Sequence, residues 1–327
     1  MHSLRIKHAP GAPGRAAGRR SPASVVALAL AGAAMTAGVG YAIWMAMGPT
    51  VFPGLSTCAA RYGFDAQLQA LQDAGPAPEA FRFVALGDSR GDLPVALEVY
   101  RRAKAEDPAF IVSTGDVGRE GSADDYLEAY APVLEALEGT PAFHVPGNHD
   151  RGIRRDYAAF RYLFGEETFS FTYGDCQFIG LNVSETVRLS REELEMLEKE
   201  LKASDARYRF VFMHIPPRYV EAELVADARR GFTVNSAALR ALLRRCRVTE
   251  VFVGHIHGYG ETEIDGVRYT LTAGAGAPLS EQLPEPWRVY NYVVVHVSPE
   301  GVRREVVLFS REDDDWVRRE TPYSAAP

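Results

Sequence analysis

The chain is poor in cysteine: its 327 residues include only Cys58, Cys176 and Cys246, and no two of them stand in a CxxC spacing. A structural zinc knuckle needs closely spaced thiolates, so we expect none. In an oxidising compartment three cysteines allow one disulfide and leave one thiol over. We expect Cys176 and Cys246, whose sequence neighbours are largely apolar, to be small buried side chains.

Positive charge is also scarce. The chain has 36 Lys and Arg against 43 Asp and Glu, which gives a formal net charge of -7. Five of the cations fall within residues 1–22, ahead of the first carboxylate at Asp65, so the remainder is more acidic still. A nucleic-acid partner needs clustered cations along its polyanionic backbone. We therefore expect no nucleic acid to bind.

Charge is missing altogether from residues 24–48. About 20 apolar residues cross a bilayer as a helix, and Tyr41 and Trp44 suit its aromatic interface. The cations of residues 1–22 place that tail in the cytoplasm and the rest of the chain outside, in the periplasm if the cell is bacterial. A cleaved signal peptide is the alternative, because residues 46–48 form a small-x-small site, although its apolar region is usually shorter.

Residues 49–80 indicate a linker with one short helix at 66–73, and residues 311–327 a C-terminal tail. Between them, over 81–310, apolar strand-like runs alternate with helical periodicity, which indicates an α/β domain with parallel strands. The expected strands are 83–86, 110–113, 143–145, 169–173, 177–181, 210–213, 251–253, 269–272, 292–297 and 302–309. The expected helices are 93–105, 124–137, 154–163, 191–202 and 236–246, and Ser190 with Glu193 forms a capping box before the fourth.

Polar residues that can bind metal directly follow five of the apolar runs. They are Asp88, Asp116, Asn148, His214, and the pair His255 and His257. Since the carboxyl ends of parallel strands open onto one crevice, we expect these side chains to converge. Oxygen and imidazole ligands without thiolate suit Mn²⁺, Fe or Zn²⁺, and one shared carboxylate would hold two such ions about 3.5–4 Å apart.

The ordered series Gly-Asp, Gly-Asp, Gly-Asn-His-Asp, His and Gly-His-x-His spans residues 87–257 and resembles the calcineurin-like metallophosphoesterase superfamily. The resemblance implies a four-layer α/β-sandwich, with two mixed β-sheets flanked by helices, over residues 81–310. It also implies two divalent or trivalent metal ions (Mn, Fe or Zn). By position, Asp116 would bridge them, Asp88 and His257 would hold the first, and Asn148, His214 and His255 would hold the second. His149 would be a catalytic residue that faces the phosphoryl group.

Two departures from the family pattern concern this site. The first motif, commonly Asp-x-His, reads Asp88-Ser89-Arg90, and a guanidinium has no lone pair for a metal. Arg90 is either a second catalytic candidate that binds a phosphate oxygen, or an arginine at the surface or behind the ligands. Residues 115–121 also lack the aspartate that orients the histidine in the phosphatase branch, and the tyrosine of purple acid phosphatases.

The expected function is hydrolysis of a phosphate ester, a monoester or a diester, by a metal-activated hydroxide at a bimetal site. The substrate would be a phosphorylated small molecule or a lipid-linked phosphate, at a membrane to which residues 24–48 anchor the chain. The alternative is a non-catalytic binding module with this fold and an incomplete first metal site. Asp150 is either part of the site or the N-cap of the helix at 154–163; we expect the cap.

Overall fold

The computed structural model describes residues 54–152, 156–310 and 315–320. The predicted cytoplasmic tail at 1–22 and the predicted membrane anchor at 24–48 lie outside these residues. Among the helices that the structure describes, none has both the length and the apolar character of a membrane span.

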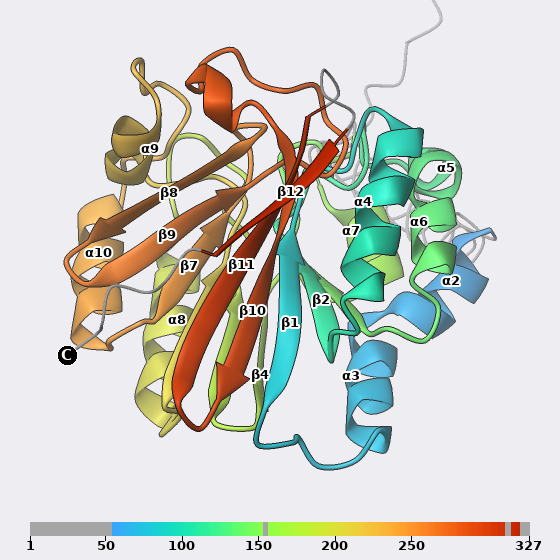
Figure 1. Cartoon of the computed structure of the whole chain (residues 1–327), viewed down its shortest axis with the longest axis horizontal. Coiled ribbons are helices and arrows are strands. Elements are labelled where there is room, and N and C mark those ends of the chain that lie inside the picture. The colour runs from blue at the N-terminus through green and yellow to red at the C-terminus, as the bar shows by residue number, and fades with distance from the viewer. Residues whose placement is uncertain (1–53, 153–155, 311–314, 321–327) are drawn as a thin grey trace, which may run out of the picture. The chain divides into compact units, whose positions relative to one another are not determined.

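Two six-stranded mixed sheets form the centre of the fold (Figure 1). The first runs, edge to edge, β12 (Asp315–Glu320), β11 (Gly301–Ser310), β10 (Tyr290–Ser298), β1 (Phe81–Leu86), β2 (Phe110–Ser113) and β3 (Ala142–His144). The second runs β4 (Phe169–Tyr173), β5 (Cys176–Gly180), β6 (Tyr208–Phe212), β7 (Glu250–Val253), β9 (Val267–Thr272) and β8 (Tyr259–Ile264). Strands β1 to β3 are parallel to one another, as are β5, β6, β7 and β9. The predicted architecture of two mixed sheets flanked by helices is confirmed.

Phenylalanine fills the space between the two sheets. Phe83 of β1 is fully buried, and its ring lies 5.1 Å from that of Phe178 and 4.9 Å from that of Phe210, on the opposite sheet. Strands that are apolar on both faces are typical of sheets covered on both sides. The rings therefore fix the two sheets face to face, and their strand ends open on the same side.

Helices cover the outer faces of both sheets. Beside the first sheet lie α2 (Leu55–Tyr62), α3 (Phe64–Asp73), α4 (Leu93–Ala105), α5 (Ala123–Asp125), the π-helical turn η1 (Tyr126–Tyr130), α6 (Ala131–Ala136) and α7 (Ala158–Phe164). On the second sheet pack α8 (Arg191–Ala203), α9 (Arg218–Leu224) and α10 (Ser236–Arg245), while a 3-10 turn, η2 (Glu285–Trp287), precedes β10. Ser190 caps α8 by accepting from the Glu193 amide at 3.1 Å, as its sequence predicted.

Six segments differ from the expectation. The single helix predicted at 124–137 is divided by the π-helical turn, and α6 then starts with Pro132 in its first turn. The helix predicted from 154 begins at Ala158. The linker at 49–80 contains α2 in addition to α3, and residues 218–233, for which no helix was predicted, contain α9. Strands β8 and β12 were not predicted, because both are edge strands rich in charged residues.

One buried ion pair joins the two sheets. Arg304 of β11 is fully buried and donates to Glu250 of β7 at 2.8 Å and to Glu261 of β8 at 2.6 Å. Glu250 begins β7, and the predicted metal ligands follow the other end of that strand. The sheets are therefore linked by charge near one end of β7 and by the candidate site at the other.

Candidate metal centre

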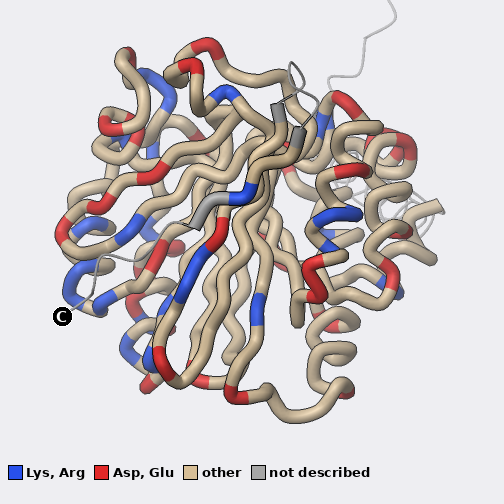
Figure 2. Tube along the Cα trace, in the orientation of Figure 1, with Lys and Arg blue, Asp and Glu red and all other residues tan. Residues whose placement is uncertain are grey.

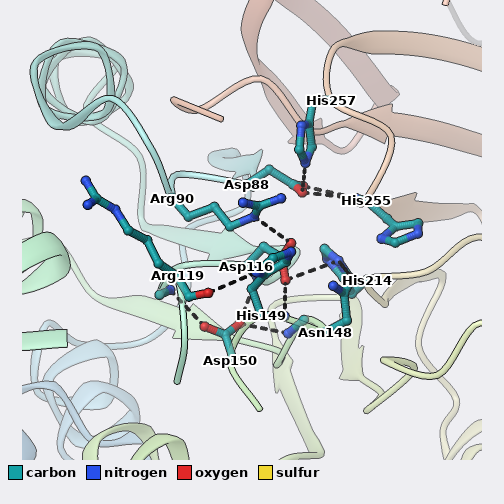
Figure 3. Close-up of polar contacts among 12 residues, drawn as sticks. Asp88, Arg90, Asp116, Arg119, Asn148, His149, Asp150, His214, His255 and His257 are labelled. Atoms are coloured by element: carbon teal, nitrogen blue, oxygen red, sulfur yellow. Dashed lines mark hydrogen bonds and ion pairs between the residues drawn. The ribbon is translucent and has the colours of Figure 1, made fainter. Parts of the chain in front are cut away.

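All six predicted metal ligands lie just beyond the carboxyl ends of parallel strands. Asp88 follows β1, Asp116 follows β2 and Asn148 follows β3, all in the first sheet. The three histidines come from the second sheet, His214 after β6, and His255 and His257 after β7. Figure 3 shows the six side chains around one centre. Ligand atoms of Asp88, Asp116 and His214 all lie within 4.8 Å of one another, and the three residues are buried.

Asp116 lies in the middle of the site. Its Oδ1 accepts from the His149 amide at 2.8 Å and lies 3.4 Å from His214 Nε2, while its Oδ2 accepts from Arg90 Nε at 3.1 Å. His214 Nε2 is also 3.1 Å from Asn148 Oδ1, and His214 Nδ1 is 2.9 Å from the Thr114 carbonyl oxygen. If Nδ1 donates to that carbonyl, the Nε2 lone pair faces two oxygens, an arrangement that a cation stabilises.

The charge state of His214 supports this interpretation. Burial lowers its pKa, but Asp116 and Asp88 together raise it to about 9. Burial raises the pKa of Asp88 well above its ordinary value, and neighbouring Asp116 raises it further while His214 lowers it. A pKa of about 9 means that His214 carries positive charge beside Asp116 when no metal is bound.

Asp88 connects the two loops that carry the other histidines. Both its oxygens accept from the His255 amide, at 3.2 and 3.1 Å, and Oδ1 lies 3.4 Å from His257 Nε2. His257 Nδ1 is held by the Pro278 carbonyl at 2.6 Å. His255 Nε2 is buried and has no hydrogen-bond partner among the residues that the structure describes. A buried ring nitrogen in that state fits a metal ligand.

Burial lowers the pKa of His255 to about 3 and that of His257 to about 4. Both imidazoles are therefore neutral at physiological pH. The neutral ring keeps the lone pair that coordination requires.

The backbone is strained at the ligands themselves. Asp88, Asp116 and His255 have φ angles of 59°, 54° and 74°, which non-glycine residues rarely adopt. Such conformations cost of order 1–3 kcal/mol each and concentrate at functional sites. Close packing maintains them: a Cβ on Gly147 would lie 2.2 Å from Asp116 Oδ1.

Asp150 fixes two of these loops to each other, so its predicted role as the N-cap of a helix at 154–163 is wrong. It is buried and accepts from the amides of Asp116 at 2.8 Å, Gly118 at 2.9 Å and Gly147 at 2.8 Å. Burial first, and Asp116 second, raise its pKa to about 7. The helix that follows begins only at Ala158. Apart from its place in Gly-Asn-His-Asp, the sequence gives no sign of this role, since the bonds come from backbone groups.

His149, the predicted catalytic histidine, lies beside the ligands. Its Nδ1 is 2.9 Å from the Arg119 carbonyl oxygen. The Arg119 amide in turn donates to Asp125 at 2.6 Å. The carbonyl thus orients the ring as the missing aspartate would have done, and any residue type at position 119 could supply it. Sequence reasoning could not identify this partner.

The chain is similar to known proteins both in sequence and in fold. The sequence model of the calcineurin-like phosphoesterase family matches residues 81–259. No curated protein matches the sequence. The fold is similar to that of GAP50, described as the anchor in the inner membrane complex of Plasmodium, with 16% identity, a TM-score of 0.58, and 76% of this chain and 90% of that chain covered.

A second similar structure is the purple acid phosphatase PPD1 from yellow lupin (Lupinus luteus) seeds. It has 16% identity and a TM-score of 0.58, with 76% of this chain and 55% of the plant chain covered. Likeness at this identity shows a shared fold. The family match includes every predicted ligand and His149, and the chain therefore belongs to the calcineurin-like phosphoesterase family.

Proposed function

We propose that this protein hydrolyses phosphate esters, monoesters or diesters, with bound metal ions. The observation that carries the proposal is the convergence of Asp88, Asp116 and His214, three buried ligands from two sheets whose donor atoms lie within 4.8 Å of one another. Mutually repelling buried carboxylates are costly unless a cation lies between them. Their burial here supports a site built for metal.

Two groups of side chains would hold the metal ions. Asp88 and His257 would form the first position, and Asn148, His214 and His255 the second, with Asp116 shared by both. A divalent ion of Mn, Fe or Zn bound there supplies Lewis-acid activation of water and neutralises phosphoryl charge. Both of the proposed metal positions thus have protein ligands, and the first position has fewer ligands than the second.

The remaining side chains act on the substrate. We propose that His149, oriented at Nδ1 by the Arg119 carbonyl, uses Nε2 to stabilise the phosphoryl group or protonate the leaving oxygen. Asp150 keeps the loops that carry Asp116 and Asn148 in register.

We propose a phosphorylated small molecule or a lipid-linked phosphate as substrate, and no nucleic acid. The formal charge of -7 supports this, and Figure 2 shows Lys and Arg interspersed with Asp and Glu in the described residues. Nucleic acid would favour a continuous basic face.

The enzyme test uses the full-length chain purified in detergent. A phosphomonoester, a phosphodiester and a nucleotide are each incubated with added Mn²⁺, Zn²⁺ or Fe. We expect hydrolysis with at least one metal, its loss in His255→Ala, and its retention in the control His296→Ala, which changes a histidine of β10 outside the site. If the wild-type protein hydrolyses none of them with any metal, the proposal fails and the binding module is favoured.

We further propose that residues 24–48 anchor the protein, with residues 1–22 in the cytoplasm and the family domain outside. The uncharged run and the preceding cations support this, and GAP50, which shares the fold, is itself named an anchor in a membrane complex. Protease added to the outer face should degrade the domain and spare a small N-terminal fragment. A soluble mature protein that begins near residue 49 would instead show a cleaved signal.

A further inference from the structure

We infer that Arg90 supplies the charge of the first metal ion, and that the centre holds one ion tightly, at the second position. This deepens the proposed metal-dependent function and rests on it. The second position is formed by Asp116, Asn148, His214 and His255.

The two oxygens of the Asp116 carboxylate face two different positively charged groups or positions. Its Oδ1 faces the second position, 3.4 Å from His214 Nε2. Its Oδ2, the oxygen left for an ion on the other side, accepts from Arg90 Nε at 3.1 Å. A carboxylate that bridges two ions through both of its oxygens offers one oxygen to each ion, and here a guanidinium already binds one of the two.

Arg90 is held in this place by its backbone as well as by its charge. The Arg90 amide donates to the Asp116 carbonyl at 3.1 Å, and the Asp88 amide donates to the Gly115 carbonyl at 2.9 Å. The loop after β1 therefore lies along the loop after β2. Figure 3 shows the guanidinium pointing toward Asp116 from beside Asp88, and the Arg90 side chain is only 21% exposed.

An arginine guanidinium carries a positive charge in proteins. This charge lies next to the first position, because Arg90 Nε is 3.1 Å from Asp116 Oδ2 and the Arg90 amide donates to the Asp116 carbonyl. A dication at that position would lie close to a fixed positive charge, and like charges in a buried site repel strongly. The same charge stabilises the carboxylates without any ion.

The first position also lacks ligands. Asp88 Oδ1 and His257 Nε2, 3.4 Å apart, are the only side-chain donors that we assign to it besides Asp116. Both Asp88 oxygens already accept from the His255 amide. The second position, in contrast, has four donor side chains. One of them is His255, whose buried Nε2 has no hydrogen-bond partner among the described residues. The two positions therefore differ in affinity.

The test counts metal ions in the full-length chain. Metal-free protein is titrated with Mn²⁺, bound metal is measured after gel filtration, and electron paramagnetic resonance distinguishes isolated from exchange-coupled Mn²⁺. We expect one equivalent with an isolated-ion spectrum, and a second that binds roughly 10–100-fold more weakly. Arg90→His removes the charge and adds an imidazole, so it should bind two equivalents and show a coupled pair. Arg102→His, which changes an exposed arginine of α4, should behave as wild type.

Three results would overturn the inference: two equivalents of similar affinity in the wild type, no bound Mn²⁺ in the wild type, or a single equivalent in a folded Arg90→His variant. The wild-type count decides even if that variant misfolds, which circular dichroism reports. One tightly bound ion without any hydrolysis would remove the proposed activity and leave the inference standing. Hydrolysis with two tight ions would do the reverse.

Discussion

His149 lies beside the metal ligands, and its backbone amide donates to one of them, at Asp116 Oδ1. We therefore expect His149→Ala to retain its metal and to lose turnover by roughly 10²–10⁴-fold, the usual scale of a general acid or base. Metal content and initial rates with a phosphomonoester and a phosphodiester measure the two effects separately.

His255→Ala is the matched comparison, since it removes a side chain that we assign to coordination. It should lose metal and activity together. Full turnover in His149→Ala would refute the catalytic role, and full metal content in His255→Ala would refute the ligand assignment.

His144, the last residue of β3, gives the protein a pH-dependent stability. It is buried, its Nε2 lies 2.8 Å from the Tyr130 hydroxyl, and burial lowers its pKa from 6.5 to about 3. The depressed folded pKa means that this contribution is complete above pH 6.5 and is lost as the pH falls toward 3. Each pH unit in that window costs about 1.4 kcal/mol.

The variant His144→Gln keeps an acceptor for Tyr130 and cannot be protonated there. Between pH 7 and pH 5 the free energy of unfolding of the wild type should fall by about 2 kcal/mol more than that of the variant. Urea denaturation at both pH values measures the difference. If the free energy of unfolding has the same pH dependence in the two proteins, His144 is protonated as readily in the folded state as in the unfolded state between pH 7 and pH 5.

Single residues also show what sequence can and cannot predict. The six ligand candidates were found because each directly follows an apolar strand, and the structure brings them together. The Asp150 contacts and the carbonyl that orients His149 were missed, because their partners are backbone atoms, which every residue carries. The pairing of Arg90 with Asp116 depends on two loops running side by side, a tertiary fact.

At the scale of elements, α9 holds the loop that follows it. Glu221 of α9 is fully buried and accepts from the amides of Arg229 at 3.0 Å, Arg230 at 2.7 Å and Gly231 at 2.6 Å. Arg230 is close enough to lower the pKa of His255. This one carboxylate therefore fixes a basic loop near the metal ligands.

Glu221→Gln replaces one acceptor oxygen by a donor group that faces other donors. We expect a cost of about 1–3 kcal/mol in the stability of the loop. Limited trypsin digestion after Arg229 and Arg230 should then be roughly tenfold faster, because the open loop is more populated. Glu223→Gln, on the exposed face of the same helix, is the control. Unchanged cleavage in Glu221→Gln would show that the loop is held by other contacts.

The elements that sequence predicted best are those with a strong apolar pattern. Strand β2 and helix α4 have the predicted bounds, since their buried positions are continuous or helically spaced. The segment 124–137 was predicted as one helix because a π-helical turn keeps helical periodicity nearly intact. Helix α9 was missed because it is only 7 residues long, too short for a helical period to be recognised in the sequence.

At the scale of the whole molecule, the buried ion pair between Arg304 and Glu250 links the two sheets, and its loss should lower the stability of the fold. Glu250→Ala leaves Arg304 buried and removes the carboxylate to which its guanidinium donates at 2.8 Å. Breaking a buried pair costs about 3–5 kcal/mol, so the thermal midpoint should fall clearly. Glu263→Ala, an exposed change on β8, should cost about 0.5 kcal/mol or less. Similar small effects in both variants would mean that Glu261 alone satisfies Arg304.

The division of the ligands between the two sheets has a consequence for biosynthesis. Asp88, Asp116 and Asn148 leave the ribosome well before His214, His255 and His257, and β10, which pairs with β1 in the first sheet, comes later still. A growing chain therefore has no assembled site, and we expect uptake of metal to wait until the sheets have docked. The metal supply of the compartment in which folding finishes, and not that of the place of synthesis, would then determine which ion the protein carries.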